Sequence, residues 1–148
     1  MGTYVITGSA TGIGGAIRER LAQAGHRVIG VDLKDADVIA DLSTDAGREA
    51  AVAGVRSLAA GGLDGMITCA GLASHVADHA LIASVNYFGS TVLVESLADL
   101  LATNSASVVM IASNSAPMST DDEYVNLLLD GNETAARPGK RNQRPRIL

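Results

Sequence analysis

The chain has 148 residues and a mass of 15.1 kDa, of which 47% are hydrophobic and 18% charged, and this composition excludes a disordered polar polymer. We see no secretory signal and no apolar run near the roughly 20 residues of a membrane span. The lack of Trp, with three Tyr and one Phe, excludes a stacking platform for single-stranded nucleic acid. Cys69 is the only cysteine, which excludes an internal disulfide and favours a reducing compartment. We therefore expect a cytoplasmic domain with neither nucleic acid nor a membrane as its partner.

Charge divides the chain at residue 137. Residues 1–136 hold all sixteen acidic side chains and six basic ones, a net charge of −10, whereas residues 137–148 carry +5 and two prolines. The basic segment has too few apolar residues to bury, so it is predicted to be a disordered tail. A weak contact with an anionic partner, such as a phosphate backbone or lipid head groups, is the alternative for this segment. Residues 1–136 are the predicted folded domain.

Short apolar runs alternate with helical periodicity along residues 1–136. Ile13, Ile17, Leu21 and Ala24 recur at helical spacing, and Gly25 follows them as a stop. Two further helices are predicted, over residues 44–60 after a Ser43 or Thr44 cap and over residues 82–102. Strands are predicted at residues 4–7, 27–32, 38–40, 66–69 and 108–112. Strands separated by helices favour a parallel sheet covered on both faces, so the predicted fold class is α/β.

A glycine-rich segment, TGSATGIGG, follows the first predicted strand and opens the first helix. In such a segment Gly8 permits the tight exit from the strand, Gly12 lets the backbone approach a pyrophosphate, and Gly14 lets helix and strand pack closely. Thr11 and Ile13 flank Gly12 at the helix N-terminus, where free N–H groups attract phosphate. The segment therefore predicts a phosphate-binding turn.

Asp32 closes the second predicted strand, 18 residues beyond Gly14. A carboxylate at this position is placed to accept hydrogen bonds from both hydroxyls of an adenosine ribose. It would repel a 2′-phosphate, and neither Thr11 nor Leu33 offers a neutralising cation, so NAD is favoured over NADP. The alternative is a glycine-rich turn that binds nothing, with Asp32 as an ordinary cap.

Three further segments add to these features: Asp41-Leu42, the turn Cys69-Ala70-Gly71 and the segment Val85-Asn86-Tyr87-Phe88-Gly89. Together they resemble the short-chain dehydrogenase/reductase family. The stretches GHRVIGVDLKDADVIADLST and SVNYFGS resemble in particular its bacterial 3-alpha-hydroxysteroid dehydrogenase/carbonyl reductase subgroup. The likeness covers residues 3 to about 136. It implies a Rossmann-type doubly wound sheet and an NAD(P)-dependent hydride transfer between a secondary alcohol, steroid-like in that subgroup, and a ketone.

The resemblance also assigns roles to residues. It implies that Asp41 and Leu42 flank the adenine and that Cys69, Ala70 and Gly71 pass along the cofactor, although the family more often has Asn at the position of Cys69. It implies that Asn86 is the active-site asparagine. Ser113 matches the serine that hydrogen-bonds the substrate oxygen.

The family's catalytic Tyr and the Lys four residues after it have no counterpart in this sequence. Residues Gly8, Thr91 and Leu128 stand four positions after Tyr4, Tyr87 and Tyr124. Because the Lys lowers the pKa of the Tyr for proton transfer, the sequence predicts an inactive chain. We expect a domain truncated after about five strands, with the adenosine half of the site nearly complete and the nicotinamide half open to water. The alternative function is a non-catalytic fragment or subunit that binds NAD or an adenine nucleotide.

Truncation would leave the strand at residues 108–111 with one unpaired edge. Residues 117–136, which include Leu127-Leu128-Leu129, are predicted to fold over that edge, or else a second chain covers it. The family's dimers bury the helix at residues 82–102, so a homo-oligomer is expected, with Phe88, Val92 and the leucines at 93, 97, 100 and 101 in core or interface.

Three patterns that can mark a metal site, a thiol nucleophile or a hydrolase are each interpreted without that role. His75 and His79 could share a helix face, but two ligands do not make a metal site, so no metal is predicted. Cys69 has no adjacent base and is interpreted as a packing residue. Ser113 and Ser115 lack a His-Asp pattern that would make them a hydrolase nucleophile.

Overall fold

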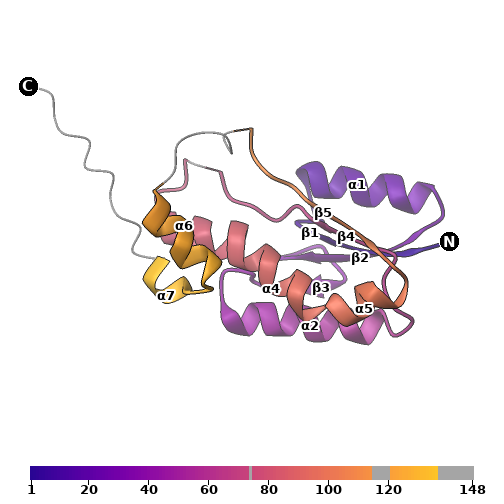
Figure 1. Cartoon of the computed structure of the whole chain (residues 1–148). Coiled ribbons are helices and arrows are strands. Elements are labelled where there is room, and N and C mark those ends of the chain that lie inside the picture. The colour runs from indigo at the N-terminus through magenta and orange to yellow at the C-terminus, as the bar shows by residue number, and fades with distance from the viewer. Residues whose placement is uncertain (74, 115–120, 137–148) are drawn as a thin grey trace, which may run out of the picture.

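The computed structural model of the protein describes residues 1–73, 75–114 and 121–136, and Figure 1 shows a central sheet with helices on both of its faces. The five strands are parallel and lie in the order β3-β2-β1-β4-β5. The strands are β1 (Thr3–Thr7), β2 (Arg27–Asp32), β3 (Val38–Ile39), β4 (Gly65–Thr68) and β5 (Ser107–Met110). The helices are α1 (Gly12–Gln23), α2 (Asp45–Leu58), α3 (His79–Ala83), the π-helical segment η1 (Ser84–Phe88), α4 (Gly89–Ser96), α5 (Ala98–Thr103), α6 (Asp122–Leu129) and α7 (Glu133–Ala136).

The sheet is covered unequally. Helix α1 lies on one face, whereas α2, α4 and α5 lie on the other (Figure 1). The main core lies on the second face, where Val5 and Met66 of the sheet and Val55 of α2 are fully buried and pack with Leu93 and Leu97. Burial of such side chains contributes roughly 1.5–3 kcal/mol each. The predicted α/β class, with a Rossmann-type parallel sheet of five strands, is confirmed.

The strand register brings the functional segments together. Thr7, at the end of β1, lies beside Val31 of β2 on one side and Thr68 of β4 on the other. Because parallel strands all run in one direction, the segments that follow them lie together at the carboxyl ends of the strands. The strand–helix turn after β1, the end of β2 and the turn after β4 are therefore neighbours.

The prediction of one continuous helix over residues 82–102 is wrong. The chain becomes helical earlier, at α3, because the Asp78 side chain accepts a hydrogen bond from the Leu81 amide at 3.1 Å and caps the first turn. It widens into η1, continues as α4 and breaks at Leu97, whose backbone φ of −105° and ψ of 8° leave the helical range. At the junction of η1 and α4, a Cβ on Gly89 would lie 3.2 Å from Leu42 Cβ. This tertiary approach is invisible to a periodicity pattern.

Helix α2 agrees closely with its prediction over residues 44–60. Thr44 is the N-cap, and its Oγ1 accepts a hydrogen bond from the Gly47 amide at 3.0 Å. Asp45 in the first turn and Arg56 in the last turn complement the helix dipole.

Strand β5 forms one edge of the described sheet and is poorly covered. Residues 108–111 are 40–49% exposed. Helices α6 and α7 lie at the other end of the molecule, beside α3 (Figure 1). The expectation that residues 117–136 fold over this edge is therefore wrong for the described residues 121–136, because α7 docks on α3 and on Arg48 instead. Cover by a second chain, and with it the homo-oligomer, stays a prediction.

Two further expectations concern residues that the structure does not describe. The basic segment 137–148 lies outside the described residues, as does Ser115. None of the helices in the described segments combines the length and apolar character needed to cross a membrane.

Candidate functional site

A cavity of about 350 Å³ opens at the carboxyl ends of β1, β2 and β4. All of the predicted cofactor-binding residues line it. These are Gly8, Thr11, Gly12, Ile13, Gly14, Asp32, Leu33, Asp41, Leu42, Cys69, Ala70 and Gly71. Val31, Ala40, Leu72 and Val85 complete the lining and were not predicted. Each of these four is the direct sequence neighbour of a predicted site residue, Val85 of Asn86, so the predicted positions themselves were the signal available for them.

The glycine turn after β1 is tight for steric reasons. Gly8 has a φ of +66°, and a Cβ there would lie 2.7 Å from the Ala70 nitrogen. A Cβ on Gly14 would lie 2.1 Å from the Gly8 carbonyl oxygen, so α1 can start this close to β1 only without a side chain at residue 14. Gly12 has a φ of +59° and open space around its Cβ position. At its glycine positions the turn therefore presents backbone to the cavity.

The N-terminus of α1 lines this cavity. Helix α1 begins at Gly12, and the N-cap Thr11 is extended, with a side chain that makes no capping hydrogen bond. The first turn of α1 contains no acidic residue. The first N–H groups of a helix and the positive end of its dipole favour an anion. This end of the cavity is suited to a phosphate group.

Asp32 closes β2 with a carboxylate that the backbone holds in place. Its Oδ2 accepts a hydrogen bond from the Ala10 amide at 2.9 Å, and its Oδ1 accepts one from the Leu33 amide at 2.7 Å. A carboxylate has about four lone-pair sites, so both oxygens can accept further hydrogen bonds. The side chain is thus oriented beside the glycine turn and suited to a ligand that carries two hydroxyl groups.

Asp41 and Leu42 form the wall after β3. Hydrogen bonds from the Ser43 hydroxyl and the Ser43 amide, the latter 2.9 Å from Asp41 Oδ1, hold the pKa of Asp41 below its ordinary value. The carboxylate therefore remains charged across the neutral range. Leu42 is 6% exposed, and its carbonyl accepts a hydrogen bond from Arg48 at 3.0 Å. An apolar side chain and a charged one thus lie next to each other at this wall.

The turn after β4 is held by a residue that the sequence did not single out. The Thr7 Oγ1 accepts hydrogen bonds from the amides of Cys69 and Ala70, both at 3.1 Å. Thr7 is fully buried at the end of β1. The turn is therefore held by a side chain from β1, although Cys69 stands where the family more often has Asn.

Cys69 behaves as a packing residue in this turn. It is partly buried, and a Cβ placed on Gly14 would lie 3.2 Å from its own Cβ. Burial raises the pKa of its thiol above the ordinary value, so the thiolate that would act as a nucleophile is disfavoured near neutral pH.

Asn86 and Ser113 lie outside the lining of the cavity. Asn86, in η1, accepts a hydrogen bond from the Leu72 amide at 2.7 Å and donates one to the Leu72 carbonyl at 3.0 Å, so it fixes the segment after β4. Ser113 follows β5, is exposed, and its Oγ lies 3.5 Å from Asn114 Oδ1. The structure does not bring the two predicted catalytic residues into the cavity lining with the cofactor-binding set.

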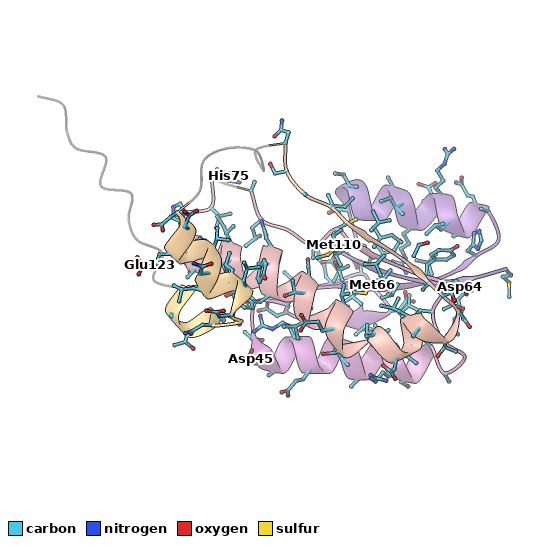
Figure 2. The ribbon with its side chains drawn as sticks, viewed as in Figure 1. Asp45, Asp64, Met66, His75, Met110 and Glu123 are labelled. Atoms are coloured by element: carbon cyan, nitrogen blue, oxygen red, sulfur yellow. The ribbon has the colours of Figure 1, made fainter. Side chains whose placement is uncertain are left out.

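The two histidines are separate from the cavity. His75 and His79 are both exposed, and Figure 2 shows His75 on the segment between β4 and α3. Among the residues that the structure describes, no three His, Cys, Asp or Glu side chains gather as a metal site would require.

The family described as short chain dehydrogenase matches residues 3–124, and this chain belongs to it. The chain is 42% identical over 137 residues to 3-alpha-hydroxysteroid dehydrogenase/carbonyl reductase from Comamonas testosteroni, a match that covers 91% of this chain and 53% of that protein. The predicted family and subgroup resemblance is thereby confirmed.

Solved structures show the same relationship. The 3-alpha-hydroxysteroid dehydrogenase from Pseudomonas sp. B-0831, complexed with NADH, matches with a TM-score of 0.88 and 43% identity over 92% of this chain and 55% of that one. A short-chain oxidoreductase from Brucella ovis, 23% identical over 92% of this chain and 72% of its own, shares the fold with a TM-score of 0.70. The chain spans about half the length of its two hydroxysteroid dehydrogenase relatives.

Proposed function

We propose that this chain binds NAD through the ADP half of the dinucleotide, as the cofactor-binding part of a short-chain oxidoreductase. The observation that carries the proposal is the cavity, in which the glycine turn, the N-terminus of α1 and the Asp32 carboxylate meet. The first two suit a pyrophosphate, and the third suits the neighbouring ribose. When bound, the nicotinamide supplies hydride transfer, while the residues described here bind and orient the cofactor.

Charge around Asp32 favours NAD over NADP. The fixed carboxylate would repel a 2′-phosphate, and the guanidinium of Arg18, which lies against Gly30 of the same strand, is already hydrogen-bonded. Arg18 donates hydrogen bonds to Asp37 Oδ2 at 3.0 Å and to the Asp35 carbonyl at 3.1 Å. An arginine can discriminate in favour of a 2′-phosphate only when its guanidinium is free to reach it.

The two halves of the site differ in completeness. The lining residues come from the segments around β1, β2, β3 and β4, together with Val85 of η1. Neither Asn86 nor Ser113, which the resemblance assigns to the reacting end, belongs to that lining. The adenosine and pyrophosphate therefore contribute most of the contacts in this proposal, and the nicotinamide contributes few.

Isothermal titration calorimetry of the full chain with AMP, ADP-ribose and NAD tests this proposal. We expect ADP-ribose to bind at least tenfold more tightly than AMP, because it adds the pyrophosphate at α1. We expect NAD to bind within about threefold of ADP-ribose. If NAD bound more than tenfold more tightly than ADP-ribose, the claim that the nicotinamide contributes few contacts would be contradicted. If none of the three bound, the proposed function would be contradicted.

The chain could catalyse the oxidoreductase reaction or bind the dinucleotide without catalysis, and one observation favours binding without catalysis. This sequence contains no Tyr followed four positions later by Lys. The pKa of tyrosine is ordinarily about 10, so proton transfer near neutral pH needs such a neighbour. We propose that the reaction class is alcohol–ketone hydride transfer, with a 3-hydroxysteroid or another carbonyl compound as substrate, and that this chain alone does not carry it out.

A spectrophotometric assay of NADH formation separates the two functions. With NAD and a 3-hydroxysteroid, the full chain is expected to produce NADH at the rate of a buffer blank. A rate well above that blank, lost when Asp32 is replaced by alanine, would show that another group of this chain replaces the phenol.

A further inference from the structure

Arg48 is a buried cation on the core-facing side of α2. Its side chain is only 2% exposed, and it follows the same helical stripe as Ala51 and Val55, both fully buried. Burying a charge is costly unless the charge is paired and hydrogen-bonded, and an apolar side chain would fill such a position more simply. The position therefore points to a specific task for the guanidinium.

Two of its hydrogen bonds reach segments that form the cavity. Arg48 Nη1 donates to the Leu42 carbonyl at 3.0 Å and to the Ser84 carbonyl at 3.4 Å. Leu42 lines the cavity, and Ser84 is the residue before Val85, which lines it too. The rigid, planar guanidinium thus connects the segment around Leu42 with the segment around Val85, which lie far apart in the sequence. We call these the two wall segments of the cavity.

The charge of Arg48 is balanced by two carboxylates. Its Nη2 donates to Glu133 Oε2 of α7 at 2.5 Å and to Asp45 Oδ1. Glu133 is 16% exposed and Asp45 is 89% exposed, so Glu133 is the less exposed of the two carboxylates. Figure 2 shows Asp45 at the end of α2 that lies near α7. The ion pair therefore ties α7 to the group that holds the wall.

We propose that Arg48 is a positioning residue for the adenine end of the cavity. It sets the spacing between the Leu42 and Val85 segments, and Glu133 holds its guanidinium in the orientation that reaches both carbonyls. This inference rests on the proposed function, since the affinity it controls is that for the ADP half of the dinucleotide.

Replacement of Arg48 by lysine tests the geometry while keeping the charge. A lysine has one ammonium point charge and cannot reproduce the planar fork, so the bonds to the two carbonyls and to Glu133 cannot all persist. We expect the Kd for ADP-ribose to rise about tenfold at a temperature well below the midpoint of unfolding. Arg56→Lys is the matched control on the same helix. Arg56 pairs with Asp99 at 2.7 Å on the exposed surface, and its replacement should leave the Kd unchanged.

Amide hydrogen exchange of the ligand-free protein separates the inference from the proposed function. Arg48→Lys is expected to raise exchange at residues 42–44 and 84–86, whereas Arg56→Lys raises it at neither. If the wild-type chain does not bind ADP-ribose, the proposed function fails, and the exchange pattern still decides whether Arg48 positions the wall. Unchanged exchange at both segments, or an unchanged Kd in a chain that binds, would overturn the inference.

Glu133→Gln provides a second variant that retains Arg48 itself. It removes the less exposed of the two negative charges, so the guanidinium is held less firmly, and we expect a rise in Kd of about threefold with faster exchange at both wall segments. Faster exchange confined to α7, with the wall segments as in the wild type, would overturn the role of Glu133 even if Arg48→Lys fails to fold.

Discussion

Replacement of Gly14 by alanine is expected to abolish measurable ADP-ribose binding and to lower the midpoint of thermal unfolding by about 10 °C. The added Cβ would lie 2.1 Å from the Gly8 carbonyl oxygen and 3.2 Å from Cys69 Cβ, so α1 must move away from β1. Overpacking of this kind costs about 3 kcal/mol of unfolding free energy at the upper end of its usual range, and a domain of this size loses about 3 °C per kcal/mol. Calorimetric melting and titration with ADP-ribose measure both effects.

Gly61→Ala is the matched control for this substitution. Gly61 follows α2 at a negative φ, and nothing lies within 4 Å of its Cβ position. Its replacement should change the midpoint by less than 2 °C and leave ADP-ribose binding intact. If Gly14→Ala binds ADP-ribose as Gly61→Ala does, the glycine turn is not the site of the pyrophosphate.

Replacement of Asp32 by alanine is expected to weaken ADP-ribose binding about 100-fold. Hydrogen bonds to a charged group contribute about 1.5–3 kcal/mol each, and the ribose offers two hydroxyls to this carboxylate. In the wild type the Ala10 and Leu33 amides donate to the two carboxylate oxygens at 2.9 Å and 2.7 Å, and the substitution leaves these amides without that acceptor. Removal of the negative charge should reduce discrimination against the 2′-phosphate, so the ratio of NADP to NAD affinity should rise at least tenfold.

Asp37→Ala is the control for Asp32→Ala because it removes a carboxylate from the same region. Asp37 accepts hydrogen bonds from the Gly30 amide at 2.7 Å and from Arg18 at 3.0 Å, and it does not line the cavity. Its loss should change the ADP-ribose affinity by less than threefold. Equal losses for the two variants would show that Asp32 acts through local stability rather than through the ribose.

Much of the fold could be predicted because its signals are local. The strands at residues 4–7 and 27–32 are β-branched runs bounded by turn residues, and the structure has β1 and β2 there. Once a parallel sheet is inferred, the carboxyl ends of its strands must meet, which is why Gly8 and Asp32 could be predicted at one site from their spacing. Cys69 was added to this site by the family resemblance.

The remaining features depend on contacts between distant segments. The widening of the predicted helix into η1 accompanies the close approach of Gly89 to Leu42, which no helical periodicity encodes. Thr7 has the sequence character of an ordinary strand residue, and only the sheet register brings its hydroxyl to the Cys69 and Ala70 amides. Arg48 sits within a helical stripe that pattern analysis assigns to apolar residues, so its pairing with Glu133, 85 positions later, was not predictable.

The central claim is that the turn between β1 and α1 binds a pyrophosphate and that the Asp32 carboxylate binds the adjoining ribose. A crystal of the full chain grown with saturating NAD tests this claim most directly. The account predicts electron density for the pyrophosphate against the amides at the start of α1, and for ribose hydroxyls within hydrogen-bonding distance of Asp32. Density for the dinucleotide elsewhere, or a glycine turn closed upon itself with no ligand beside Asp32, would contradict it.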